Sequence, residues 1–166
     1  MKTELRYGII FAGVVVVYVM IEHVLGFNTV RHDIGQYTRL AGVLVPIIAI
    51  VLGVRAKRRE LNGQLTFGQG VKTGFLIAVI QTTLTTLWFL FYGSVINPEF
   101  VNTMLEFERT KMTNAGSTTA EINSSIGTMR TLYSFPYLQL FQEVIGVIYG
   151  LIVAVLAAAI FRRRAK

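Results

Sequence analysis

Cysteine is absent from this chain, tryptophan occurs once, and acidic residues are few: nine, against sixteen lysines and arginines. The lack of cysteine excludes disulfide bonds, thiol catalysis and thiolate metal sites. The remaining candidate nucleophiles and bases also form no catalytic, nucleotide-binding or metal-binding motif, since serine and threonine are scattered and no pair of histidines is spaced for a metal. We therefore expect no enzyme, no metal and no cofactor.

What the chain has in abundance is hydrophobic sequence, 53% of its 166 residues, and this is gathered into four long stretches. A helix needs about 20 mostly apolar residues to cross a bilayer, and in lipid a helix satisfies its own backbone groups. The sequence predicts a single all-α integral-membrane domain over residues 1–166. Its four transmembrane helices are expected at about 7–25, 38–55, 72–94 and 136–161.

The basic residues predict the orientation of these helices. They lie in three groups: Lys2 and Arg6 before the first stretch; Arg55, Lys57, Arg58, Arg59 and Lys72 between the second and third; and Arg162, Arg163, Arg164 and Lys166 after the fourth. Basic loops stay in the cytoplasm, and an even number of spans puts both termini on one side. We expect both termini to be cytoplasmic. Topology thus accounts for the net charge of +7, and we expect no nucleic-acid partner.

A cleaved signal peptide is the alternative for the first stretch, because Lys2 and Arg6 precede an apolar run. However, no Ala-x-Ala site follows, and Glu22 and His23 stand where cleavage would occur. We favour an uncleaved helix.

Local signals place several helix ends. Thr66 and Gln69 match a capping box, which predicts that the third helix begins near Phe67, and Pro46 predicts a kink in the second. The outer segment at about 97–134 is expected to form a helical hairpin on the membrane surface. Its predicted signals are a cap at Asn97, a stop at Gly116, a second capping box formed by Thr118 and Glu121, and an entry to the last span at Pro136.

Ionisable side chains inside a membrane are costly and are functional candidates. Those of this chain fall in the outer half, and the candidate polar cluster is Glu22, His23, Arg39, Gln81, Gln142 and Glu143. One interpretation is a proton- or ligand-binding site that opens outward. The other is a satisfied polar network that fixes the register of the helices.

Small residues line one face of the last span at helical spacing, with Gly146, Gly150 and Ala154 four residues apart. Without a hydrophobic force between helices in lipid, such faces allow close packing. We expect this face to pack against another helix.

Several segments carry a family resemblance, above all Leu65–Gly74 (LTFGQGVKTG) and Ile96–Phe100 (INPEF). With Glu108–Met112, Gly116–Ser117, Glu121–Ile122 and the start Met1–Gly8, the chain resembles the uncharacterised membrane family catalogued as domain of unknown function four-one-nine-nine. The resemblance implies a bacterial inner-membrane protein with four spans. It implies no activity, substrate or catalytic residue.

Two functions remain open. The first is a non-enzymatic accessory or scaffold subunit that contacts the lipid bilayer and either another membrane protein or further copies of itself. The second is a small oligomeric transporter or channel that uses Glu22 and Glu143.

Overall fold

The computed structural model describes residues 2–134 and 137–163, and within these ranges it contains helices and no strands. The elements are α1 (Lys2–Val24), α2 (His32–Gly42), α3 (Leu44–Glu60), α4 (Phe67–Phe91), the π-helix η1 (Tyr92–Ile96), α5 (Phe100–Asn114), α6 (Thr119–Leu132) and α7 (Tyr137–Phe161). Four segments are long and apolar enough to cross a membrane: α1, α2 with α3, α4 with η1, and α7. The predicted all-α membrane fold with four spans is confirmed. Pro136, Arg164 and Lys166 lie outside the described residues.

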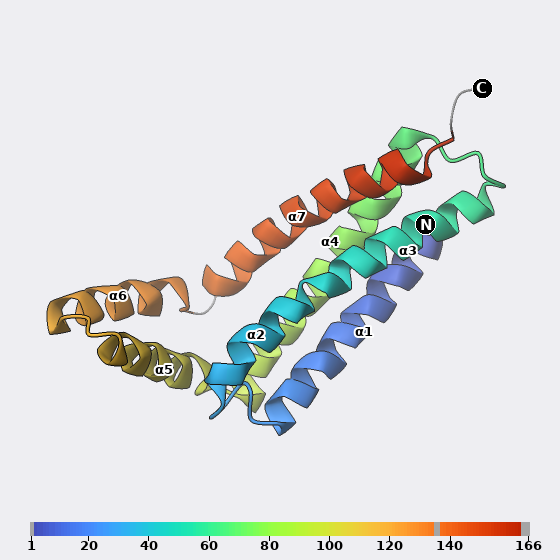
Figure 1. Cartoon of the computed structure of the whole chain (residues 1–166). Coiled ribbons are helices and arrows are strands. Elements are labelled where there is room, and N and C mark those ends of the chain that lie inside the picture. Colours follow the sequence, from blue (N-terminus) through green and yellow to red (C-terminus); the bar gives the residue numbers. More distant parts are fainter. Residues whose placement is uncertain (1, 135–136, 164–166) are drawn as a thin grey trace.

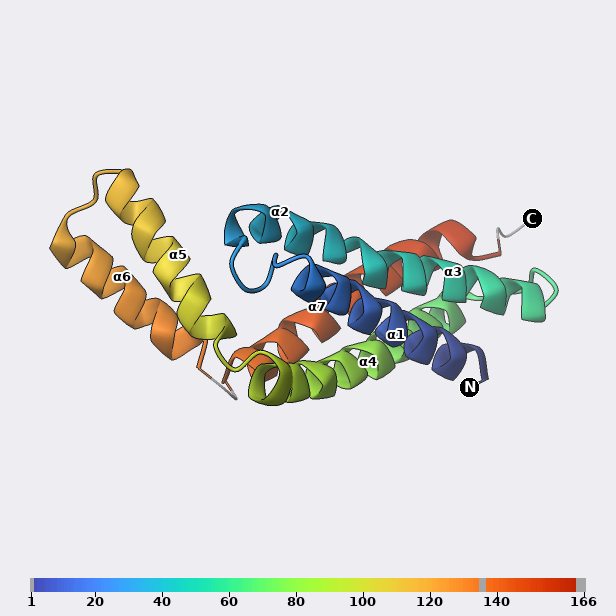
Figure 2. The same ribbon diagram turned by 90° about the horizontal axis from the view of Figure 1, so that it is seen from below.

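The four spans form an elongated bundle (Figure 1). The N-terminus, the loop between α3 and α4 and the end of α7 lie at one end, called here the α3–α4 end. The end of α1, α2 and η1 lie at the other, beside the short helices α5 and α6, and this is called the α5–α6 end. Figure 2 shows α5 and α6 side by side, extending away from the bundle. They are joined through Arg109, whose guanidinium donates to Asn123 at 3.3 Å. Their place outside the cytoplasm stays a prediction.

The second span starts earlier than expected and is interrupted. Helix α2 begins at His32, and the chain passes into α3 through Val43. Pro46 then lies in the first turn of α3, where its missing N–H leaves no bond unmade. The interruption lies at Val43, three residues before Pro46, where φ and ψ remain helical, and the predicted kink at Pro46 itself stays a prediction.

Both predicted capping boxes are confirmed. The Thr66 hydroxyl accepts from the Gln69 amide while Gln69 accepts from the Thr66 amide, and α4 begins at Phe67. Thr118 and Glu121 make the same pair of bonds at the start of α6. Hydrogen bonds from the Thr118 backbone and hydroxyl hold the pKa of Glu121 below its ordinary value.

The predicted cap at Asn97 is wrong. Helix α5 begins at Phe100, with Glu99 at the cap position. The Asn97 side chain instead donates to the carbonyl of Asn28 at 2.8 Å and to the hydroxyl of Tyr92 at 3.1 Å. Both bonds are made by Nδ2, and the side chain makes no capping bond to α5.

Small residues bring α4 and α7 into close contact. A Cβ added at Gly150 would lie 2.3 Å from the Cβ of Ala78, and one added at Gly74 would lie 2.5 Å from the Cβ of Ala154. The main apolar core lies in the same half of the bundle, towards the α3–α4 end, and consists of Ala49, Ile50, Val54, Leu65, Ile77, Ala78, Val153, Ala154 and Ala157. This half of the molecule is closely packed, whereas the other half is hollow.

Candidate functional site

A cavity of about 390 Å³ lies between the spans in the half of the bundle nearest the α5–α6 end. Its walls come from the second half of α1, the α2–α3 junction, the last turns of α4 with η1, and the first half of α7. Most of the lining is apolar, and a few polar side chains from different helices converge on it. This composition is typical of a small-molecule site.

Glu22 is the acidic group of the cavity and is only 4% exposed. Both of its carboxylate oxygens accept hydrogen bonds: Oε2 from the Asn28 amide at 3.2 Å, and Oε1 from the Thr38 hydroxyl. The backbone of Thr38 is in turn held by the hydroxyl of Tyr18, which donates to its carbonyl at 2.6 Å. A buried carboxylate is tolerated where donors surround it in this way.

Arg39 is the basic group of the cavity. Its Nη1 donates to Oδ1 of Asn28 at 3.2 Å, and its guanidinium lies 5.8 Å from the centre of the Phe100 ring. The Asn28 amide therefore connects Arg39 to Glu22, and within the described part of the chain the two charges form no ion pair at 4.0 Å or less. Most of the five N–H donors of this guanidinium remain available.

Three glutamines add to the polar lining, which also includes Thr82, Thr85 and Thr86. Gln81 on α4 and Gln139 on α7 are each 3% exposed, and Oε1 of each has no hydrogen-bond partner among the described residues. Gln142 lines the same cavity from α7. Because an unpartnered buried amide oxygen costs free energy, the two buried glutamines mark positions where a donor would be stabilising.

The structure thus brings together Glu22, Arg39, Gln81 and Gln142 from the predicted cluster, and leaves His23 and Glu143 outside the cavity wall. Nδ1 of His23 is 3.0 Å from the Tyr92 hydroxyl, and the two rings meet edge to face. Because the Asn97 amide donates to this hydroxyl, Tyr92 can donate its own proton to His23.

Glu143 lies on a different side of α7. Its Oε1 accepts from the hydroxyl of Thr83 on α4 at 2.9 Å, and its Oε2 has no partner in the described ranges. Thr83 is exposed, whereas Glu143 is half-buried and its Oε2 is buried. Glu143 therefore lies partly covered at the contact between α4 and α7, outside the cavity wall.

The small-residue face of α7 is turned towards α4. A Cβ at Gly146 would lie 2.8 Å from Thr82, and Ala154 packs against Gly74 in the same way that Gly150 packs against Ala78. The predicted packing face of α7, made of Gly146, Gly150 and Ala154, thus contacts α4 of the same chain.

Sequence reasoning did not select Asn28, Thr38 or Tyr92, although these hold Glu22, Arg39 and His23 in place. Asn28 and Thr38 lie in or beside a polar loop with no local pattern that distinguishes them. The available signal for Tyr92 is its place at the end of a span. The π-helix that starts there is a type of bulge frequently found at functional sites.

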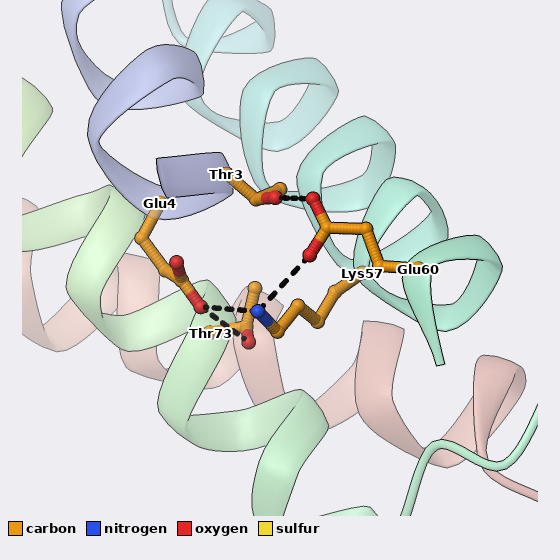
Figure 3. Close-up of polar contacts among 5 residues, drawn as sticks. All are labelled: Thr3, Glu4, Lys57, Glu60 and Thr73. Carbon is orange, nitrogen blue, oxygen red and sulfur yellow. Dashed lines mark hydrogen bonds and ion pairs between the residues drawn. The ribbon is translucent and has the colours of Figure 1, made fainter. Parts of the chain in front are cut away.

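A second polar cluster lies at the α3–α4 end (Figure 3). The Lys57 ammonium lies 3.6 Å from Oε1 of Glu4 and 3.1 Å from Oε2 of Glu60. Thr73 donates to Glu4 at 3.1 Å, and Thr3 donates to Glu60. The cluster joins α1, α3 and α4, so Lys57, which the sequence assigned only to a basic loop, also links helices.

Metal ligands do not gather in the described residues, where no three His, Asp or Glu side chains could hold one ion. No curated protein and no solved structure matches the chain. The model of one family does, over residues 6–163. The chain belongs to this family, which is described as Protein of unknown function (DUF4199).

Proposed function

We propose that this multi-pass membrane protein is a non-enzymatic accessory or scaffold subunit of the bacterial cytoplasmic membrane, with both termini in the cytoplasm. The basic residues before α1, between α3 and α4, and after α7 support this orientation. The α3–α4 end, where these groups meet, is then the cytoplasmic end, and the cavity lies in the outer half of the bilayer.

The observation that carries the proposal is the position of Glu143. This carboxyl group lies within a span and is half-buried, with a single hydrogen bond from the exposed Thr83 to Oε1 and a buried Oε2 that has no partner among the described residues. The surrounding surface is apolar, since Phe141 is 66% and Val144 57% exposed. Placing an acid against lipid is costly, and a donor from a neighbouring membrane helix would offset this cost.

The small-residue face of α7 is occupied by α4, so a partner must bind elsewhere. The surface between α4 and α7 around Glu143 and Thr83 lies within a span, has exposed apolar side chains around it and contains a half-buried, incompletely bonded acid. A partner helix with an arginine, lysine or hydroxyl at the same depth fits this surface.

Native mass spectrometry of the tagged protein, gently extracted from its own membrane, tests the proposal. We expect a second protein in fixed stoichiometry, retained by Glu106→Gln, which changes an exposed acid of α5, and lost from Glu143→Gln. Equal retention by the two variants would exclude this surface as the partner site.

A small oligomeric transporter or channel is the second candidate, and the cavity beside Glu22 favours it. Because Glu143 lies outside the cavity, the transported species would meet Glu22 and Arg39 rather than the two acids together. Flux in proteoliposomes is the assay. A bare homo-oligomer whose flux is lost in Glu22→Gln would support transport, and fluxes unchanged by this variant would count against it.

A further inference from the structure

We propose that the cavity is a binding site for one phospholipid-type amphiphile, whose phosphate binds Arg39 and whose headgroup donors bind Gln81 and Gln139. This inference goes beyond the accessory function and does not depend on it, because the cavity and the Glu143 surface share no residue.

Arg39 identifies the charge of the ligand. Its guanidinium lines the cavity, makes one hydrogen bond, to Asn28, and forms no ion pair within the described ranges. Glu22, the only acid that lines the cavity among the described residues, already accepts from Asn28 and Thr38, so its lone pairs are partly used. The group with free capacity is thus a cation with a planar set of donors, which suits the oxygens of a phosphate.

Gln81 and Gln139 identify the second property of the headgroup. Both side chains are more than nine-tenths buried, and both amide oxygens lack a partner in the part of the chain that the structure describes. These oxygens require donors, which a bare phosphate diester cannot supply. A headgroup that carries hydroxyl or ammonium hydrogens beside its phosphate supplies both kinds of bond.

The remaining lining suits an acyl chain. Apolar side chains come from α1, α3, α4 and α7, among them Val15, Val19, Pro46 and Phe89. The volume of about 390 Å³ falls in the range of sites that hold small organic ligands. A site with an apolar wall and a polar group at one side favours an amphiphile over a free ion.

The test is a titration of the purified full chain, in a neutral detergent, with five probes followed by native mass spectrometry. Lysophosphatidylglycerol and lysophosphatidylethanolamine carry the phosphate, the donors and the chain. Lysophosphatidylcholine lacks donors on its ammonium, monoacylglycerol lacks the phosphate, and inorganic phosphate lacks the chain. We expect the first two to bind about tenfold or more tightly than the other three, the factor that one charged hydrogen bond supplies.

Variants assign the contacts. Arg39→Gln should weaken the binding of lysophosphatidylglycerol about tenfold. Arg31→Gln serves as the matched control, because this exposed arginine stacks on Phe27 outside the cavity, and it should leave binding unchanged. Gln139→Leu should remove the preference for lysophosphatidylglycerol over lysophosphatidylcholine. Circular dichroism verifies that each variant is folded, and Gln139→Leu provides the test if Arg39→Gln does not fold.

Three results would overturn the proposal: equal affinity in Arg39→Gln and Arg31→Gln, equal affinity for lysophosphatidylglycerol and monoacylglycerol, or binding of inorganic phosphate as tight as that of the lysolipid. The last would identify a free-anion site. None of these results depends on the partner predicted for Glu143, so the two proposals can fail separately.

Discussion

Replacement of Gly150 by alanine tests the close packing of α4 against α7. The added Cβ would lie 2.3 Å from the Cβ of Ala78, whereas ordinary contacts between carbon atoms are about 3.5–4.0 Å. The overlap exceeds about 1 Å. The next atoms, Cα of Ala78 at 3.6 Å and Cδ1 of Ile50 at 3.7 Å, are at ordinary distances, so one methyl group causes the whole conflict.

The loss of stability in Gly150→Ala depends on which atoms must move to relieve this overlap. The Ala78 methyl group is fixed to the backbone and cannot rotate away, so the helices must separate, and overpacking of this kind costs about 1–3 kcal/mol. Alanine also gains about 0.5–1 kcal/mol over glycine inside a helix. The control Gly13→Ala receives only that gain, because nothing lies within 4 Å of its added Cβ. We expect Gly150→Ala to be less stable than Gly13→Ala by about 1–3 kcal/mol.

The assay is reversible unfolding in mixed micelles with increasing dodecyl sulfate, followed by the fluorescence of Trp88, the only tryptophan of the chain. The decisive variant combines Gly150→Ala with Ala78→Gly, which removes the conflicting methyl group and should restore stability. At Gly74, by contrast, Ala154→Gly should rescue Gly74→Ala only in part, because the Cα of Ala154 would still lie 2.9 Å away. Full stability of Gly150→Ala alone, or no rescue by Ala78→Gly, would refute the packing argument.

Two further predictions concern the ends of the molecule. Lys57→Met removes the ammonium that lies 3.6 Å from the buried Glu4 and 3.1 Å from Glu60, and we expect a loss of roughly 1–3 kcal/mol in the same unfolding assay, against less than about 0.5 kcal/mol for the exposed Arg58→Met. Equal losses would refute a role for the cluster. Because the chain has no cysteine, single cysteines at Ser117 and Asn62 can report topology with a maleimide that does not cross membranes. Ser117→Cys should react in intact cells and Asn62→Cys only after permeabilisation, and the reverse pattern would invert the proposed orientation.

The sequence was sufficient to predict structure where the signal lies in neighbouring residues. Span lengths follow from hydrophobic runs, and the starts of α4 and α6 follow from a hydroxyl and an acceptor three residues apart. It failed at Asn97, because this side chain binds the carbonyl of Asn28, 69 residues away along the chain, as well as the nearby Tyr92. Local patterns predict what a side chain can do, and tertiary contacts decide which option it takes.

The hydrophobic pattern of the sequence also could not predict how each helix is rotated about its own axis within the bundle. Gln142 and Glu143 are neighbours, and each residue turns a helix by about 100°. That one step places Gln142 on the cavity and Glu143 against the exposed Thr83, outside the cavity wall. Periodicity groups residues on a face but does not say which neighbour that face meets. The predicted polar cluster is therefore divided between Gln142, which lines the cavity, and Glu143, which does not.

The hollow itself can be traced to side-chain size along α4 and α7. Towards the α3–α4 end, the facing pairs are Gly70 with Ala158, Gly74 with Ala154 and Ala78 with Gly150, and the backbones come close together. Towards the other end, Thr82 meets Gly146, and beyond it the lining passes to larger groups, including Phe89 on α4 and Gln139 on α7. Larger side chains hold helices further apart, and here they face the junction between α2 and α3. The same gradient of residue size thus closes one half of the bundle and opens the other, which is where Glu22, Arg39 and the buried glutamines lie.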